Sequence, residues 1–159
     1  FGKSWLQDWQ LHAIATLTSG PPFTVAILPD IDQSNTGRSN LGFGTNDRPN
    51  ASGDGSLSAG DRSEDRWFDT AAFSFPAFGS FGNAGRNILD GPGYKDLNLG
   101  VTKILPVADA RLQLRLEIFN VFNRANFALP DAFLGSPTFG RILSAGAPRR
   151  VQLGVKALF

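Results

Sequence analysis

The chain has 159 residues and a formal net charge of +1, so it is long enough for a folded domain but has no basic excess that would predict nucleic-acid binding. It contains no Cys, which excludes disulfides, thiolate metal sites and a cysteine nucleophile. No run approaches the roughly 20 apolar residues of a membrane-spanning helix. With 18 Gly, 10 Pro and 14 Phe, the composition predicts strands joined by long irregular connections.

The first predicted strand covers residues 8–17. Apolar and polar residues alternate along it, with Trp9, Leu11, Ala13, Ala15 and Leu17 on one face and Gln10, His12, Thr16 and Thr18 on the other. A period of two is the signature of a β-strand. We predict that this strand extends toward Ile27, with a kink or exit at Pro21 and Pro22, because two consecutive prolines cannot both pair in a central ladder.

A polar, Gly-rich connection follows over residues 28–93, far longer than an ordinary loop. Its second half is rich in aromatic residues: Trp67, Phe68, Phe73, Phe75, Phe78 and Phe81. One interpretation is a surface, formed by Trp67, Phe68 and Phe73, on which a ligand stacks. The alternative, which we favour, is a small apolar core within the connection itself, because so many rings must be buried somewhere.

Residues 94–105 and 111–122 are predicted to form a hairpin, since only residues 106–110 separate two alternating runs. Leu97 and Leu99 lie on the apolar face of the first run. The second run places Leu112, Leu114, Leu116 and Ile118 opposite Arg111, Gln113, Arg115 and Glu117. Such a charged face suits water, either outside a soluble sheet or inside a wide barrel.

A second long connection, residues 123–148, leads to the last predicted strand over 149–159. Here Val151, Leu153, Val155, Ala157 and Phe159 alternate with Arg150, Gln152, Gly154 and Lys156. The length and alternation are those of one membrane-crossing strand. The connections are therefore long, short and long, as in bacterial barrels, which have short periplasmic turns and long extracellular loops.

We therefore predict an all-β fold: an antiparallel transmembrane β-barrel fragment of about four strands with two long extracellular loops. The alternative is a soluble carbohydrate-binding or adhesive β-sandwich, which would bury the same leucines beneath a second sheet. Neither a Gly-x-Ser-x-Gly elbow nor a phosphate-binding loop is present, and the one histidine, His12, lies on a polar face. We expect no enzymatic activity, no cofactor and no metal site.

Several motifs in order make the chain resemble the C-terminal region of TonB-dependent outer-membrane receptors of the Oar-like type. They are SGPPFTV (19–25), WFDTAAF (67–73), FGNAGRN (81–87), GPG (91–93), EIFNVFN (117–123), GSPTFG (135–140) and the final alternation up to Phe159. The resemblance implies that residues 1–159 are the C-terminal part of a plugged barrel of about 22 strands, with the plug domain and earlier strands absent. It also implies a bacterial outer-membrane location and a role in nutrient uptake, with no indication of the substrate.

The resemblance further implies partners: the remainder of the barrel and its plug, outer-membrane lipid, the barrel-assembly machinery, and the TonB energy-transducing protein through an N-terminal region absent here. No nucleic acid is among them. Phe159, with Val155 and Leu153 on the same face, resembles the signal that the assembly machinery reads.

Overall fold

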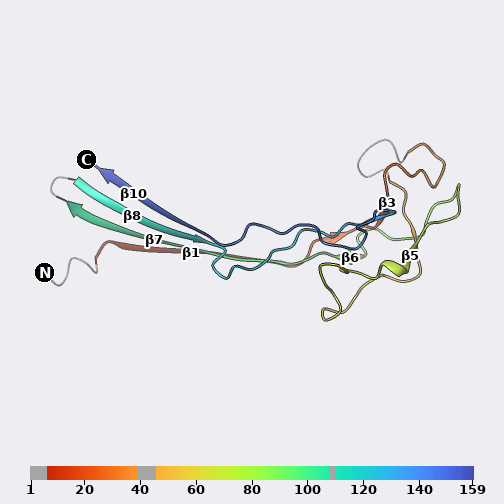
Figure 1. Cartoon of the computed structure of the whole chain (residues 1–159), viewed down its shortest axis with the longest axis horizontal. Coiled ribbons are helices and arrows are strands. Elements are labelled where there is room, and N and C mark those ends of the chain that lie inside the picture. Colours follow the sequence, from red (N-terminus) through yellow and green to blue (C-terminus); the bar gives the residue numbers. More distant parts are fainter. Residues whose placement is uncertain (1–6, 39–45, 108–109) are drawn as a thin grey trace. The chain divides into compact units, whose positions relative to one another are not determined.

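The computed structural model in Figure 1 describes residues 7–38, 46–107 and 110–159. The chain divides into two compact units. The first, here the sheet unit, comprises the described residues within 1–18, 94–126 and 146–159. The second, here the loop unit, comprises those within 19–93 and 127–145.

The sheet unit consists of four strands in the order β1 (Trp9–Thr18), β7 (Tyr94–Val107), β8 (Ala110–Phe119) and β10 (Arg150–Leu158), every neighbouring pair antiparallel (Figure 1). The four predicted strands and their sequential pairing are confirmed. Thr18 pairs with Tyr94, and Arg150 pairs with Phe119, so both long connections leave from one end of the sheet. Leu158 pairs with Arg111, which places the end of β10 beside the hairpin, as predicted.

The hairpin is tighter than predicted. Val107 pairs with Ala110, so the ladder between β7 and β8 extends to the two residues on either side of 108–109. Only residues 108–109 of the predicted link over 106–110 remain between the two strands, and they lie outside the described residues. Pro106 itself lies within β7, opposite Arg111.

The predicted extension of the first strand toward Ile27 is wrong. β1 ends at Thr18, and the prolines mark its exit as predicted. Pro22–Phe23 (β2) pairs with Leu89–Asp90 (β6), whereas Ala26–Ile27 (β3) pairs in parallel with Phe133–Leu134 (β9). Because proline lacks a backbone N–H, the chain leaves the main ladder here and pairs within the loop unit instead.

The strand predicted over 111–122 also ends early, at Phe119. Asn120 adopts a left-handed conformation with φ of 51°, which Asn tolerates better than most residues. Its buried side chain donates to the carbonyl oxygens of Arg124 and Ala147 and accepts from the Arg124 N–H at 3.0 Å. These bonds turn the chain out of the sheet, so Phe122 lies beyond the strand.

The loop unit contains the hydrophobic core of the described chain. Its buried apolar residues are Phe23, Val25, Ile27, Phe68, Phe73, Ala84 and Leu89. Phe68 is at the centre: its ring meets Phe23, Phe73 and Phe139 at centroid separations of 5.7, 5.9 and 5.2 Å. The last two contacts are edge-to-face, the arrangement that aromatic quadrupoles favour. A short 3-10 turn, Thr70–Ala72, and the pair β4 (Asn50–Ala51) and β5 (Phe73–Ser74) complete the unit.

Phe139 belongs to the second long connection and Phe68 to the first, so the aromatic core joins the two. Backbone hydrogen bonds hold the same junction, because the Trp67 N–H donates to the Gly140 carbonyl at 2.9 Å. Gly140 has φ of +85°, and a Cβ there would lie 2.5 Å from the methyl carbon of Thr70. Only glycine therefore fits the position.

Replacing Phe68 with Ala should destabilise the loop unit by about 3–5 kcal/mol, the usual loss for a buried Phe. The measurement is limited proteolysis of the full-length protein, in which cleavage between residues 19 and 93 should become markedly faster. Phe78→Ala is the matched control, because that ring is 73% exposed. Equal protease resistance of the two variants would contradict the assigned core.

Candidate functional site

One face of the sheet is apolar across all four strands. In an antiparallel ladder directly paired residues share a face, so the register fixes this face without ambiguity. It carries Trp9, Leu11, Ala13, Ala15 and Leu17 of β1, Lys95, Leu97, Leu99, Val101, Lys103 and Leu105 of β7, Leu112, Leu114, Leu116 and Ile118 of β8, and Val151, Leu153, Val155 and Ala157 of β10. The predicted facing is confirmed for the leucine, isoleucine and valine residues at 97, 99, 112, 114, 116, 118, 151, 153 and 155.

This apolar face is exposed. Leu11 is 75% and Leu153 79% accessible, and Leu17, Val151 and Val155 are similarly open. Within the described part of the sheet unit no second sheet packs on the face, whereas the sandwich alternative requires one. Monomeric soluble proteins rarely leave so large a contiguous apolar surface in water, and lipid is the solvent that would favour it.

The opposite face is polar. It carries Gln10, His12, Ile14 and Thr16, then Asp96, Asn98, Gly100, Thr102 and Ile104, then Gln113, Arg115 and Glu117, and finally Gln152, Gly154 and Lys156. The Arg115 Nη1 and Glu117 Oε1 atoms lie 3.7 Å apart, which is the distance of a weak, partly solvated ion pair. The His12 ring lies against Gly100, where a Cβ would be 2.0 Å from the histidine Nε2. This face has the character of a water-filled lumen.

Lys103 is a charged residue on the apolar face that the sequence reasoning did not single out. It is buried, with 7% of its surface exposed. Its ammonium nitrogen lies 5.3 Å from the centroid of the Trp9 ring and donates a hydrogen bond to the Gln7 carbonyl. A Trp beside a Lys near the hairpin end of a strand is typical of a membrane-water interface, and this pattern could have identified the pair.

The three residues of the predicted ligand surface differ in their exposure to solvent. Phe68 and Phe73 are core residues, only 1% and 5% exposed, so neither ring is accessible to a ligand. Trp67 is half-buried, donates its indole N–H to the Asp90 carbonyl at 2.9 Å and carries the Arg62 guanidinium over its ring. The favoured alternative, burial in an apolar core, is confirmed for these two phenylalanines, but the core also includes Phe23 and Phe139 from outside the connection. It is wrong for Phe75, Phe78 and Phe81, which are exposed. Ligand binding by the loops stays a prediction.

The predicted assembly residues Leu153, Val155 and Phe159 are all highly exposed. Leu153 and Val155 lie on the apolar face of β10, and the alternation continues to Phe159 just beyond the strand. Their recognition by an assembly machinery stays a prediction.

Within the ranges 7–38, 46–107 and 110–159, no helix is long and apolar enough to cross a membrane. The same residues include no cluster of three or more His, Cys, Asp or Glu side chains placed to hold a metal ion.

Comparison with known families decides between the two environments proposed for the apolar face. Residues 1–152 match the family described as outer membrane beta barrel domain. The chain belongs to this family. Its location is therefore the bacterial outer membrane, and its apolar face is the lipid-facing side of a barrel wall. No curated protein and no solved structure matches the chain. The soluble sandwich is not retained.

Leu153→Arg should lower the amount of folded barrel in the outer membrane, because a lipid-facing Arg near mid-strand costs about 2–4 kcal/mol. Gln152→Arg is the matched control, since the neighbouring residue faces the polar side. Folded protein in outer-membrane fractions can be measured by its altered gel mobility before and after heating. Equal loss in both variants would contradict the assigned facing.

Proposed function

We propose that this outer-membrane barrel domain is part of the wall and extracellular loops of a TonB-dependent receptor that imports a nutrient. The main supporting observation is the asymmetry of the sheet. Both long connections leave from the end where Thr18 meets Tyr94 and Phe119 meets Arg150, while a tight hairpin closes the other end. Long extracellular loops and short periplasmic turns distinguish bacterial barrels.

The folded loop unit supports a receptor more than a passive pore. Here the two connections fold onto one aromatic cluster around Phe68 and Phe139. A surface that is already ordered loses less conformational entropy when it binds a ligand.

The hairpin end would face the periplasm, with Trp9 and Lys103 at that interface. The partners we propose are the remainder of the barrel and a plug domain, outer-membrane lipid, the barrel-assembly machinery, and the TonB protein contacted by a region outside these residues. We propose no enzymatic activity and no nucleic-acid partner.

The proposal can be tested without knowing the substrate. The full-length gene product, purified in neutral detergent, should bind the periplasmic domain of the host's TonB protein in an interferometry assay. In planar bilayers it should conduct little, because a plug fills the lumen of such transporters. Open-channel conductance together with no TonB binding would show a passive pore and refute the proposal.

We also propose that the apolar end of β10 is recognised during assembly. Phe159→Ala should reduce the outer-membrane level of the full-length protein much more than its synthesis. Loss of burial alone would cost at most about 1.5–3 kcal/mol, so a near-total assembly defect would indicate recognition.

The matched control for Phe159→Ala is Leu158→Ala. Leu158 pairs with Arg111 on the opposite face of the strand, and its truncation should leave the level close to that of the wild type. The measurement is the ratio of folded barrel to pulse-labelled precursor. If Phe159→Ala assembles at the wild-type level, Phe159 is not recognised during assembly.

A further inference from the structure

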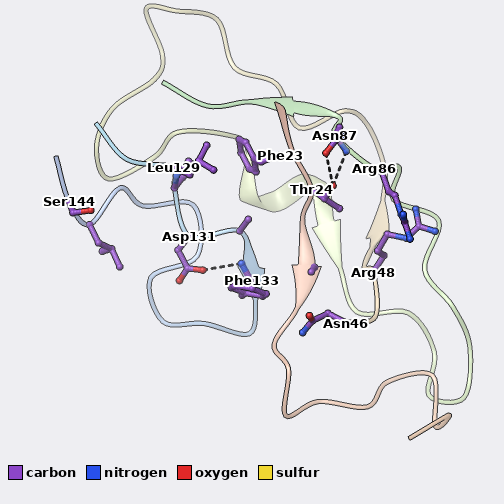
Figure 2. A pocket seen from close by; sticks show the side chains of 14 residues that line it. Phe23, Thr24, Asn46, Arg48, Arg86, Asn87, Leu129, Asp131, Phe133 and Ser144 are labelled. Carbon is purple, nitrogen blue, oxygen red and sulfur yellow. Dashed lines mark hydrogen bonds between the residues drawn. The ribbon is translucent and has the colours of Figure 1, made fainter. Parts of the chain in front are cut away.

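The loop unit contains a pocket with a volume of about 780 Å³, shown in Figure 2. Both long connections contribute to it. Its walls are Phe23, Thr24, Ala26, Asn46, Arg48, Arg86 and Asn87 from the part of the loop unit within 19–93, and Leu129, Pro130, Asp131, Ala132, Phe133, Leu143 and Ser144 from the part within 127–145. The volume lies within the range of pockets that hold drug-sized organic ligands.

Two arginines supply the positive charge of the pocket. Arg86 is exposed and makes no hydrogen bond or ion pair with any residue that the structure describes. Arg48 is half-buried, and its Nη1 donates to the Ala84 carbonyl at 2.8 Å, which anchors the guanidinium in the wall. Each guanidinium retains N–H donors in the planar geometry that matches a carboxylate or phosphate.

Asp131 is the one acid among the described residues that line the pocket, and its carboxylate is already bonded within the protein. Burial raises the pKa of the Asp131 carboxyl, but hydrogen bonds from the Ser136 and Thr138 hydroxyls and the Phe133 backbone N–H outweigh it, so the pKa lies below its ordinary value. Asp131 is therefore ionised and held in place at neutral pH.

The charges of the pocket are separated in space. In the view of Figure 2, Asp131, Leu129 and Ser144 lie across the pocket from Arg48 and Arg86. A bound anion would consequently be attracted to the arginine side and repelled from the Asp131 side.

Most of the remaining wall is apolar. Leu143 is 65% and Leu129 47% exposed, and Phe23, Pro130 and Phe133 line the same space. When an apolar ligand removes these leucines and aromatic rings from water, the free energy falls, which favours binding. Asn46, Asn87, Thr24 and Ser144 add neutral hydrogen-bonding groups.

We propose that this pocket binds an amphipathic organic anion, with its acidic group at Arg86 and Arg48 and its apolar body along Leu129, Phe133 and Leu143. The inference rests on the proposed receptor function in one respect, because it names the class of ligand that the extracellular loops would capture. The pocket itself follows only from the geometry of the loop unit.

The test uses the full-length protein in nanodiscs, titrated calorimetrically with three probes of one shape. They are 2-naphthoate, neutral 2-naphthamide and the cationic 2-naphthylmethylammonium ion. The naphthoate should bind about tenfold more tightly than either of the others, the discrimination expected of a charge-assisted hydrogen bond. Equal affinities, or tightest binding of the cation, would overturn the proposal.

Two variants separate the charged and apolar contributions. Arg86→Gln should weaken naphthoate binding by about tenfold and leave naphthamide binding unchanged, whereas Leu143→Ser should weaken both by about fivefold. Arg38→Gln is the matched control, because Arg38 is an exposed arginine of the same unit that does not line the pocket. Wild-type naphthoate affinity in Arg86→Gln would overturn the assigned anion site.

The outcome is independent of the TonB-binding and conductance measurements. If naphthoate fails to bind while TonB binding is intact, the ligand class is wrong and the receptor function stands. If naphthoate binds at Arg86 but TonB does not, the pocket stands and the transport proposal fails.

Discussion

In the hydrocarbon core of a membrane, no water is present to satisfy a backbone N–H or carbonyl group, so each must find a partner within the protein. This constraint governs the sheet unit. Three antiparallel ladders join β1, β7, β8 and β10, and the period of two in each strand then directs one set of side chains outward. The apolar face that would be a liability in water becomes the contact with lipid.

The loop unit folds in a different way, by burying apolar surface in a core. It does so with rings and glycines. Phe68 contacts three other phenylalanines, and Gly140 allows the second connection to approach Thr70 closely. The two units therefore follow different physical rules: backbone pairing with exposed leucines in one, and aromatic burial with irregular backbone in the other.

This division has a consequence for function. Three of the four rings of the aromatic cluster, Phe68, Phe73 and Phe139, do not line the pocket, so most of the groups left for a ligand are those at the margin of the core, such as Arg86, Leu129 and Leu143. The free arginine and the exposed leucines come from different connections. The same core that orders the loops thus brings these groups to one pocket, and ligand recognition would depend on a residue such as Phe68 that no ligand touches.

The sequence by itself determined the four strands, their order and their facing, because alternation is a local property and lipid exposure leaves it undisturbed over Leu112 to Ile118 and Val151 to Val155. It did not determine where β1 and β8 end, because partners distant in sequence decided both ends. Residues 22–27 pair with Leu89–Asp90 and Phe133–Leu134 and so do not extend β1. Asn120 bonds to the Ala147 carbonyl and so ends β8. Nor could composition distinguish buried Phe68 and Phe73 from exposed Phe78, since burial of each ring depends on partners distant in sequence, such as Phe23 and Phe139. The pocket was likewise beyond reach of the sequence, because Arg48, Arg86 and Leu143 meet only when two long connections fold on one core.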